Sequence, residues 1–184
     1  MTGYRALFLD RDGVINRDDG YVYRRKDFHF IDGIFELTAA AVVRGFLPII
    51  VTNQSGIGRG YYSERRFLQL MRWVRRQFHR HRAPIAGVYY CPFHPEHGIG
   101  RYRQDSFLRK PHPGMLLRAA ADFRLDLQRS LLVGDSPGDM EAGRAAGVGR
   151  LFYLCPDATP SKITEYDNIQ QVSRLADIVP ALDS

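Results

Sequence analysis

The sequence contains only two cysteines, Cys91 and Cys155, so disulfide bonds cannot be its main source of stability. No apolar run approaches the roughly 18 residues of a membrane-spanning helix. The first 13 residues break their one apolar stretch with Asp10 and lack the pattern of a signal peptide. The sequence therefore predicts a cytoplasmic protein with no membrane partner.

Lysine is also scarce, with three lysines against 23 arginines in a chain of net charge +6. The densest basic run, residues 65–82, holds seven arginines and could suggest a nucleic-acid partner. Apolar residues recur in the same run at helical spacing: Phe67, Leu70, Met71, Val74 and Phe78. The arginines are therefore expected on the solvated faces of an amphipathic helix, and no nucleic-acid binding is predicted.

Apolar runs alternate with helical patterns along the chain. Strands are predicted at 4–10, 46–52, 86–91, 130–135 and 150–155. Helices are predicted at about 33–44, 63–82, 114–124 and 137–146, with a last short helix within 173–184. This alternation predicts an α/β fold, a doubly wound parallel sheet with helices on both faces. With 184 residues and no repeat or linker, the chain is expected to form one domain, 1–184.

Polar residues stand where three of the predicted strands end: Asp10, Thr52 and Asp135. In parallel sheets ligands bind outside the carboxyl ends of the strands, so these side chains can share one crevice. Asp12 lies two residues after Asp10, so the period of two in a strand could direct both carboxylates toward the same side. Gly13 follows at once and lets the chain turn sharply.

Two more segments add groups suited to phosphate and to a hard cation. Lys110 is a compact cation that could neutralise charge on a transferred group. Asp139 follows Asp135 by four residues and offers further oxygen for Mg²⁺. Each has a plainer interpretation, with Thr52 as a helix cap, Lys110 as a surface charge and Asp139 as an acid in a first helical turn. Their occurrence in order on successive elements favours a shared site.

The order Asp-x-Asp-Gly, Thr-Asn, Lys, Gly-Asp-x-x-x-Asp along residues 10–139 resembles the four motifs of the haloacid dehalogenase superfamily of phosphatases. Within it, the chain is most similar to the small phosphatases that act on heptose bisphosphate or histidinol phosphate. The similarity lies in residues 10–22, 30–33, 51–60, 89–92, 109–116 and 133–140. This resemblance implies a Rossmann-like haloacid dehalogenase fold. The short segments 13–45 and 92–109 leave no room for a large cap domain.

The resemblance also implies catalytic roles. Asp10 would be the nucleophile and Asp12 the general acid and base, while Thr52 and Lys110 would hold the phosphoryl oxygens. Mg²⁺ would be held by the side chains of Asp10 and Asp135 and by the backbone carbonyl of Asp12. Asp139 would orient these ligands from outside the metal shell.

The expected substrate is a small sugar bisphosphate bound by a monomeric enzyme. Its predicted contacts are Asp18, Asp19, Gly20, Tyr21, Asn53, Gln54, Ser55, Arg109 and Ser136. Arg109 would contact the second phosphate, for which its planar guanidinium is well suited. Ser136 stands where the family often has a lysine, which removes a cation from the rim of the pocket.

A loop insertion at about 92–109 corresponds to a zinc-binding loop in relatives. The four ligand positions carried over to this chain are Cys91, Phe93, Ser106 and Leu108, and the last three cannot serve as ordinary zinc ligands. His94 and His97 could join Cys91, but no fourth ligand is evident. No zinc is therefore expected, and Phe93, Phe107 and Leu108 are predicted to hold the loop by apolar packing.

The leading hypothesis is a Mg²⁺-dependent phosphatase that removes the 7-phosphate of a heptose bisphosphate, in the supply of nucleotide-activated heptose for surface polysaccharide. A histidinol-phosphate or other small sugar-phosphate phosphatase is the alternative within the family. A protein that binds phosphosugars without turnover is the alternative of another class, and it would be marked by loss of a catalytic residue.

Overall fold

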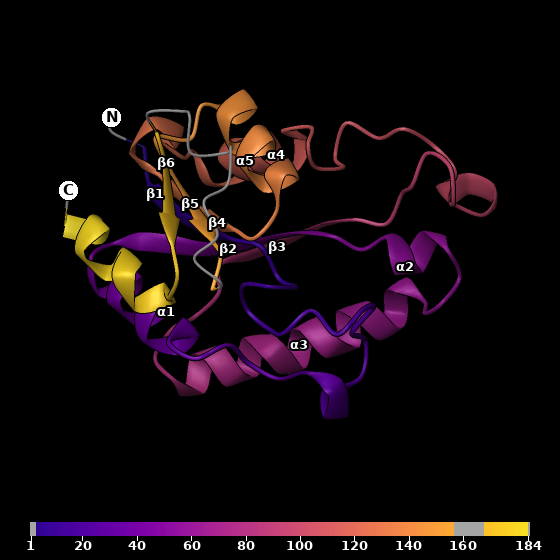
Figure 1. The fold of residues 1–184 in the computed structure, drawn as a ribbon, viewed down its shortest axis with the longest axis horizontal. Coiled ribbons are helices and arrows are strands. Elements are labelled where there is room, and N and C mark those ends of the chain that lie inside the picture. Colours follow the sequence, from indigo (N-terminus) through magenta and orange to yellow (C-terminus); the bar gives the residue numbers. More distant parts are fainter. Residues whose placement is uncertain (1–2, 157–167, 184) are drawn as a thin grey trace.

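A computed structural model describes residues 3–156 and 168–183. Its centre is a parallel six-stranded sheet in the order β3-β2-β1-β4-β5-β6 (Figure 1). The strands are β1 (Arg5–Leu9), β2 (Phe46–Asn53), β3 (Gly87–Cys91), β4 (Leu131–Gly134), β5 (Arg150–Leu154) and β6 (Ile169–Val172). The doubly wound parallel sheet predicted from the sequence is confirmed.

Strand β1 shows why these segments read as continuous apolar runs. Leu7 and Leu9 enter the hydrophobic core on one face of the sheet, whereas Ala6 and Phe8 enter the core on the other. All four side chains are fully buried. A strand covered on both faces has no solvent-facing positions, so no polar residue stands between Arg5, where β1 begins, and Asp10.

Helices cover both faces of the sheet. In Figure 1 helices α1 and α3 and the C-terminal 3₁₀ helix η5 lie on one side, and α4 and α5 lie on the other. The α-helices are α1 (Ile34–Val43), the short α2 (Ser55–Gly58), α3 (Glu64–Arg80), α4 (Gly114–Phe123) and α5 (Pro137–Ala146). The described 3₁₀ helices are η1 (Arg25–Asp27), η2 (Gly100–Tyr102), η3 (Leu127–Arg129) and η5 (Leu175–Asp183).

Helix α3 carries the arginine-rich run. Its N-terminus is capped by Ser63, whose hydroxyl oxygen accepts a 3.3 Å hydrogen bond from the backbone N–H of Arg66. Its buried residues are the predicted apolar set, Phe67, Leu70, Met71, Val74 and Phe78. The amphipathic helix is therefore confirmed, with its apolar stripe packed in the core and its arginines on the remaining faces.

The five predicted strands and the predicted helices are present, with ends shifted by at most a few residues. Strand β6 was missed, because only Ile169 and Val172 are buried and two glutamines lie between them. Such a four-residue edge strand pairs only with β5 and has too little apolar pattern to be recognised. Helix α2 was also missed, since half of its four residues are glycines.

The strand order places β1 between β2 and β4, so the chain reverses its direction of winding at β1. The carboxyl ends of these three strands therefore meet at a topological switch point, where open α/β sheets bind ligands. The connections around it are loops, short helices and 3₁₀ turns, with no large cap among the described residues. Within those residues, no helix has the length and apolar character needed to span a membrane.

Gly149 offers a test of how tightly β5 packs against η3. A Cβ atom at this position would lie 1.8 Å from the backbone carbonyl oxygen of Gln128. We expect Gly149→Ala to lower the free energy of unfolding by about 1–3 kcal/mol, because the backbone must shift to relieve the overlap. Urea denaturation followed by circular dichroism measures the loss.

Gly147→Asn is the matched control for this substitution. Gly147 has a φ of 80° but nothing lies near its Cβ position, and asparagine tolerates such a φ. The control should cost less than about 1 kcal/mol. Equal losses in the two variants would contradict the proposed close contact.

Candidate active site

The predicted strand-end residues meet in one pocket of about 420 Å³. Asp10 follows β1 directly, Thr52 lies near the end of β2 before Asn53, and Asp135 follows β4. The pocket is lined by Asp10, Asp12, Asp18, Gly20, Tyr21, Thr52, Asn53, Gln54, Ser55, Gly56, Tyr62, Lys110, Asp135 and Ser136. Residues far apart in the sequence are thus brought together by the parallel strands.

Gly13 allows the chain to leave β1 close to β4. Its φ is 83°, a conformation that favours glycine, and a Cβ atom there would lie 1.8 Å from a carboxylate oxygen of Asp135. A side chain at this position would therefore occupy the space that Asp135 needs. The glycine of the Asp-x-Asp-Gly motif is required both by the turn and by the close approach.

Lys110 is the buried cation of the site, with only 7% of its surface exposed. Its Nζ lies 2.8 Å from Oδ1 of Asp10 and 2.5 Å from Oδ1 of Asp139, and it donates a 3.0 Å hydrogen bond to the carbonyl of Val51. Burial by itself would lower the pKa of Lys110, but the two carboxylates outweigh it and raise the pKa above its ordinary value. Lys110 therefore stays charged.

Asn53 fixes the position of Lys110 through the backbone. Its side-chain Nδ2 donates to the carbonyl oxygen of Lys110 at 3.0 Å, and its Oδ1 accepts from the N–H of Lys110 at 3.1 Å. Although Asn53 lines the pocket, as expected for a substrate contact, its amide thus also joins β2 to the segment that carries the lysine.

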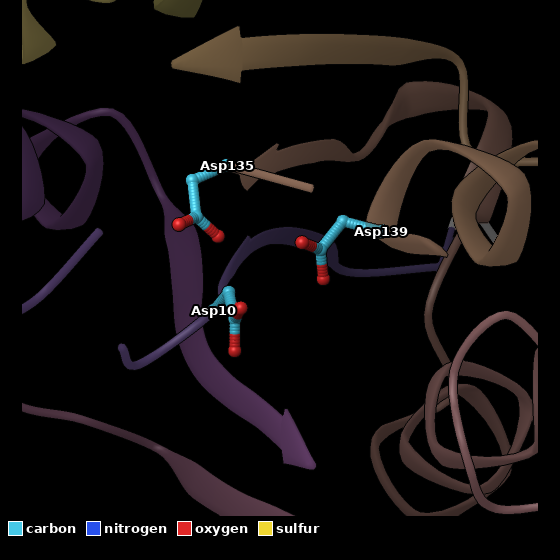
Figure 2. A group of neighbouring side chains, drawn as sticks. All are labelled: Asp10, Asp135 and Asp139. Carbon is cyan, nitrogen blue, oxygen red and sulfur yellow. The ribbon is translucent and has the colours of Figure 1, made fainter. Parts of the chain in front are cut away.

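Three carboxylates surround this lysine. One oxygen from each of Asp10, Asp135 and Asp139 lies within 4.8 Å of the others, and Figure 2 shows the three side chains facing a common space. Burial, followed by the charge of Asp139, raises the pKa of Asp10 well above its ordinary value and that of Asp135 to about 7. One lysine cannot balance three carboxylates, so a further cation could neutralise the negative charge that remains when they are ionised.

The hydrogen bonds of Asp139 suggest which carboxylates would hold such a cation. Its Oδ1 faces Lys110, and its Oδ2 accepts from the hydroxyl of Ser136 at 2.5 Å and from the backbone N–H of Ser136 at 3.2 Å. Ser136 in turn caps α5, so the two residues form a capping box. Asp10 and Asp135 have more oxygen capacity left for a hard divalent cation such as Mg²⁺.

Asp12 is paired with a cation of its own. Arg11 is completely buried and forms an ion pair with Oδ1 of Asp12, which also accepts a 3.0 Å hydrogen bond from Asn16 Nδ2. The Oδ2 of Asp12 accepts from Gln54 Nε2 at 3.1 Å. Asp10 and Asp12 are two residues apart, yet each has a different positive partner.

The predicted substrate contacts divide into two groups. The pocket is lined by seven of them: Asp18, Gly20, Tyr21, Asn53, Gln54, Ser55 and Ser136. Asp19 lines a neighbouring hollow instead, and Arg109 is absent from the lining and donates from NH1 to the carbonyl of Phe93 at 3.2 Å. The pocket is also lined by Gly56, whose backbone N–H the sequence suggests as a phosphate ligand, and by Tyr62. Sequence reasoning missed Tyr62, because it neither follows a predicted strand nor carries a charge.

The Cys/His segment of the insertion does not gather its candidate ligands. Among residues 3–156 and 168–183, the acidic cluster is the one group of at least three Asp, Glu, His or Cys side chains close enough to share a metal. The Nδ1 of His94 accepts hydrogen bonds from the backbone N–H groups of Glu96 and His97. Cys91 is buried, and burial raises the pKa of its thiol.

Two of the three residues predicted to hold this loop do pack against the core. Phe93 and Leu108 contact the hydrophobic cluster that contains Cys91. The prediction for Phe107 was wrong, since this side chain is 61% exposed. Phe107 is held instead through its backbone, since its carbonyl oxygen accepts a hydrogen bond from the N–H of Gly114 at the start of α4. Tyr102 adds a polar anchor, donating to Glu64 on α3 at 2.6 Å.

The sequence of this chain is similar to those of known phosphatases. A family model described as HAD-hydrolase-like matches residues 107–178. The D-glycero-alpha-D-manno-heptose-1,7-bisphosphate 7-phosphatase of Burkholderia mallei is 62% identical over 151 residues, which is 82% of this chain and 80% of that protein. The chain belongs to the haloacid dehalogenase-like phosphatases.

Two further relatives extend the comparison. The D-glycero-beta-D-manno-heptose-1,7-bisphosphate 7-phosphatase of Vibrio cholerae is 52% identical over 160 residues, covering 87% of this chain and 84% of that protein. A solved D,D-heptose 1,7-bisphosphate phosphatase from B. bronchiseptica, complexed with magnesium and phosphate, has a TM-score of 0.82 at 23% identity. The match covers 97% of both chains, so the two proteins share the same fold.

The acidic cluster predicts that Mg²⁺ stabilises the protein in a pH-dependent way. In the metal-free protein the pKa of Asp135 is raised to about 7, so the folded state binds a proton more tightly than the unfolded state, and stability falls as pH rises from about 4 to 7. Mg²⁺ needs the deprotonated carboxylates. We therefore expect Mg²⁺ to raise the Tm of chelator-treated protein more at pH 8 than at pH 5.5.

Differential scanning fluorimetry at both pH values measures this difference. Asp135→Asn is the control, because it removes the charge: it should raise the Tm of the metal-free protein at pH 8 and abolish most of the response to Mg²⁺. A response to Mg²⁺ of the same size at both pH values would contradict the assignment of the cluster.

Proposed function

We propose that this chain hydrolyses the 7-phosphate of D-glycero-D-manno-heptose 1,7-bisphosphate in a Mg²⁺-dependent reaction through an aspartyl-phosphate. The product would enter nucleotide-heptose synthesis for surface polysaccharide in the cytoplasm, and residues 1–184 would act as a monomeric, single phosphatase domain. The observation that carries the proposal is the buried ion pair of Asp10 and Lys110 at the switch point of the sheet, beside Thr52 and Asp12. The names of the two relatives above support the substrate.

In the first half of the reaction, a carboxylate oxygen of Asp10 attacks phosphorus and the bond from phosphorus to the sugar oxygen breaks. Asp12 gives its proton to the departing oxygen, so that the sugar leaves as a neutral alcohol. Lys110, charged and held 2.8 Å from Asp10, and the hydroxyl of Thr52 bind the phosphoryl oxygens as charge shifts onto them. The phosphoryl group is then bonded to Asp10.

In the second half, Asp12 takes a proton from a water molecule, and the resulting hydroxide attacks the phosphorus. The bond from phosphorus to Asp10 breaks, which releases inorganic phosphate and restores both aspartates to their starting forms. One carboxyl group can serve as acid and then as base because the second half-reaction returns to Asp12 the proton that it gave away in the first.

Mg²⁺ would be held by the side chains of Asp10 and Asp135 and by the backbone carbonyl of Asp12, while Asp139 orients the group through Ser136 and Lys110. When bound, it supplies the positive charge that allows an anionic nucleophile and an anionic phosphate to meet. The fit rests on the chemistry of the donors, three largely buried carboxylates with one lysine to balance them.

The sugar and its second phosphate would extend from this centre toward the surface. Tyr21 and Asp18 line the pocket, and Arg109 lies next to Lys110 in the chain. Burial lowers the pKa of His94, and the nearby guanidinium groups of Arg109 and Arg59 lower it further. We assign Arg109 to the second phosphate, which this concentration of positive charge would attract.

The substrate is tested by measuring phosphate release from a defined panel. It contains both anomers of heptose 1,7-bisphosphate, heptose 7-phosphate and histidinol phosphate, because the relatives' names include both anomers. We expect kcat/KM to be highest for one of the bisphosphates, and Arg109→Gln to reduce it there more than for heptose 7-phosphate. A preference for histidinol phosphate would replace the proposal with its alternative.

The nucleophile is tested with Asp10→Asn. This substitution removes a buried charge next to Asp139 and Asp135, so we expect the folded protein and its Tm to be retained while turnover is lost by at least about 10³-fold. Phosphate release and circular dichroism measure the two effects. Retained activity would refute the nucleophile, and wild-type protein that binds heptose bisphosphate without any turnover would indicate a binding protein.

A further inference from the structure

Gln54 lies at the centre of a buried network of hydrogen bonds to other groups of the protein. It is 2% exposed, and both ends of its side-chain amide are occupied. Its Nε2 donates to Oδ2 of Asp12 at 3.1 Å and to Oγ1 of Thr52 at 2.9 Å. Its Oε1 accepts from the hydroxyl of Tyr62 at 2.6 Å and from NH1 of Arg11 at 3.3 Å.

Arg11 and the hydroxyl of Tyr62 together fix which way this amide points. An amide can be rotated by half a turn with little change in shape, so its orientation follows from its partners. Burial raises the pKa of Tyr62 well above its ordinary value, so the hydroxyl keeps its proton and can donate. The guanidinium of Arg11 can only donate, so the amide oxygen must face Arg11 and the donating hydroxyl of Tyr62, which turns Nε2 toward Asp12 and Thr52.

The same network distinguishes the two carboxylate oxygens of Asp12. Its Oδ1 already accepts from Nε and NH2 of Arg11 and from Asn16 Nδ2. Its Oδ2 accepts only from Gln54 among the described contacts, and the side chain is 22% exposed and lines the pocket. The oxygen that carries the transferred proton is therefore Oδ2, and Gln54 sets its direction.

Thr52 is oriented by the same amide. Its Oγ1 accepts from Gln54 Nε2, so its own hydroxyl hydrogen is directed elsewhere, and the open side of this residue faces the pocket. A hydroxyl whose hydrogen points into the pocket can donate to a phosphoryl oxygen. One amide thus prepares both a proton carrier and a phosphate ligand.

We propose that Tyr62 and Gln54 are positioning residues, which hold Oδ2 of Asp12 and the hydroxyl of Thr52 in the directions that phosphoryl transfer and proton transfer require. The inference rests on the proposed phosphatase chemistry but not on the identity of the sugar. It assigns Gln54 to Asp12 and Thr52 instead of to the substrate, and it gives a role to Tyr62, which sequence reasoning missed.

Leaving groups of different basicity separate this role from a merely structural one. Expulsion of phenol from phenyl phosphate needs a proton more than expulsion of 2,4-dinitrophenol does, while the two substrates offer a similar ring. We expect Tyr62→Phe to lower kcat/KM for phenyl phosphate about tenfold and Gln54→Met to lower it about 100-fold. For 2,4-dinitrophenyl phosphate the losses should be several times smaller, with only the effect through Thr52 remaining.

Tyr23→Phe is the matched control for Tyr62→Phe. The ring of Tyr23 stacks on that of Tyr62 with centroids 5.0 Å apart, but its hydroxyl is bonded to exposed Arg24 and not to Gln54. Removal of this hydroxyl should leave both kcat/KM values within about twofold of wild type, because it touches no part of the network. Losses in Tyr62→Phe that are equal for both leaving groups would overturn the inference.

A crystal structure of the Gln54→Met protein tests the same roles without any activity assay. We expect the carboxylate of Asp12 to rotate from its position beside Thr52, since Oδ2 has lost its donor. An unchanged Asp12 would overturn the inference. If the leaving-group effect appears but no heptose bisphosphate is hydrolysed by the wild-type protein, the proposed substrate fails and the positioning roles stand.

Discussion

The buried ammonium of Lys110 is the interaction on which this site depends. It lies between Asp10 and Asp139 and is bonded to the backbone of β2 through Val51. Without it, three largely buried carboxylates would lie close together with no positive partner, and each uncompensated buried charge costs several kcal/mol. Through these contacts Lys110 connects its own segment, after the insertion, to the ends of β1 and β2 and to the start of α5. It is therefore a central contact at this end of the fold, besides the catalytic role proposed for it.

The two aspartates of the first motif show how neighbouring acids can lie in different surroundings. Asp10 faces Lys110 in the acidic cluster, where burial raises its pKa, whereas Asp12 is paired with the completely buried guanidinium of Arg11. In a regular strand, side chains two residues apart point to the same face of the sheet and would share similar surroundings. Here the turn at Gly13 and two separate cations give them different electrostatic environments, the usual means by which enzymes divide acid, base and nucleophile among carboxyl groups.

The insertion between β3 and α4 brings the lysine to the site and depends on ordinary packing. Phe93 and Leu108 pack on the core, and Tyr102 is bonded to Glu64. Both ends of the loop are therefore attached to rigid elements, and Asn53 fixes the backbone of Lys110 itself. That this loop needs no zinc remains a prediction. The contacts that would replace the metal are apolar surface and a tyrosine–glutamate bond.

The amino-acid sequence was enough to predict the succession of strands and helices and to single out the groups proposed to carry the chemistry. Apolar runs that end in Asp10, Thr52 and Asp135 predict a parallel sheet with polar residues at its carboxyl edge, because strands buried on both faces tolerate polar side chains only where they end. For the same reason β6, with two glutamines between its buried ends, left no recognisable pattern. The exposure of Phe107 could not be predicted either, since an aromatic residue next to Leu108 gives no sign in the sequence of whether its ring is buried.

The partner of each polar side chain follows from the folded chain and could not be predicted from the sequence. Gln54 and Asn53 looked like substrate contacts in the sequence, yet the amide of Gln54 is shared between Asp12 and Thr52, and that of Asn53 holds the backbone of Lys110. Tyr62 carried no signal at all. Hydrogen bonds depend on distances of about 3 Å between groups distant in the chain, and such distances follow from packing rather than from the period of a strand or helix.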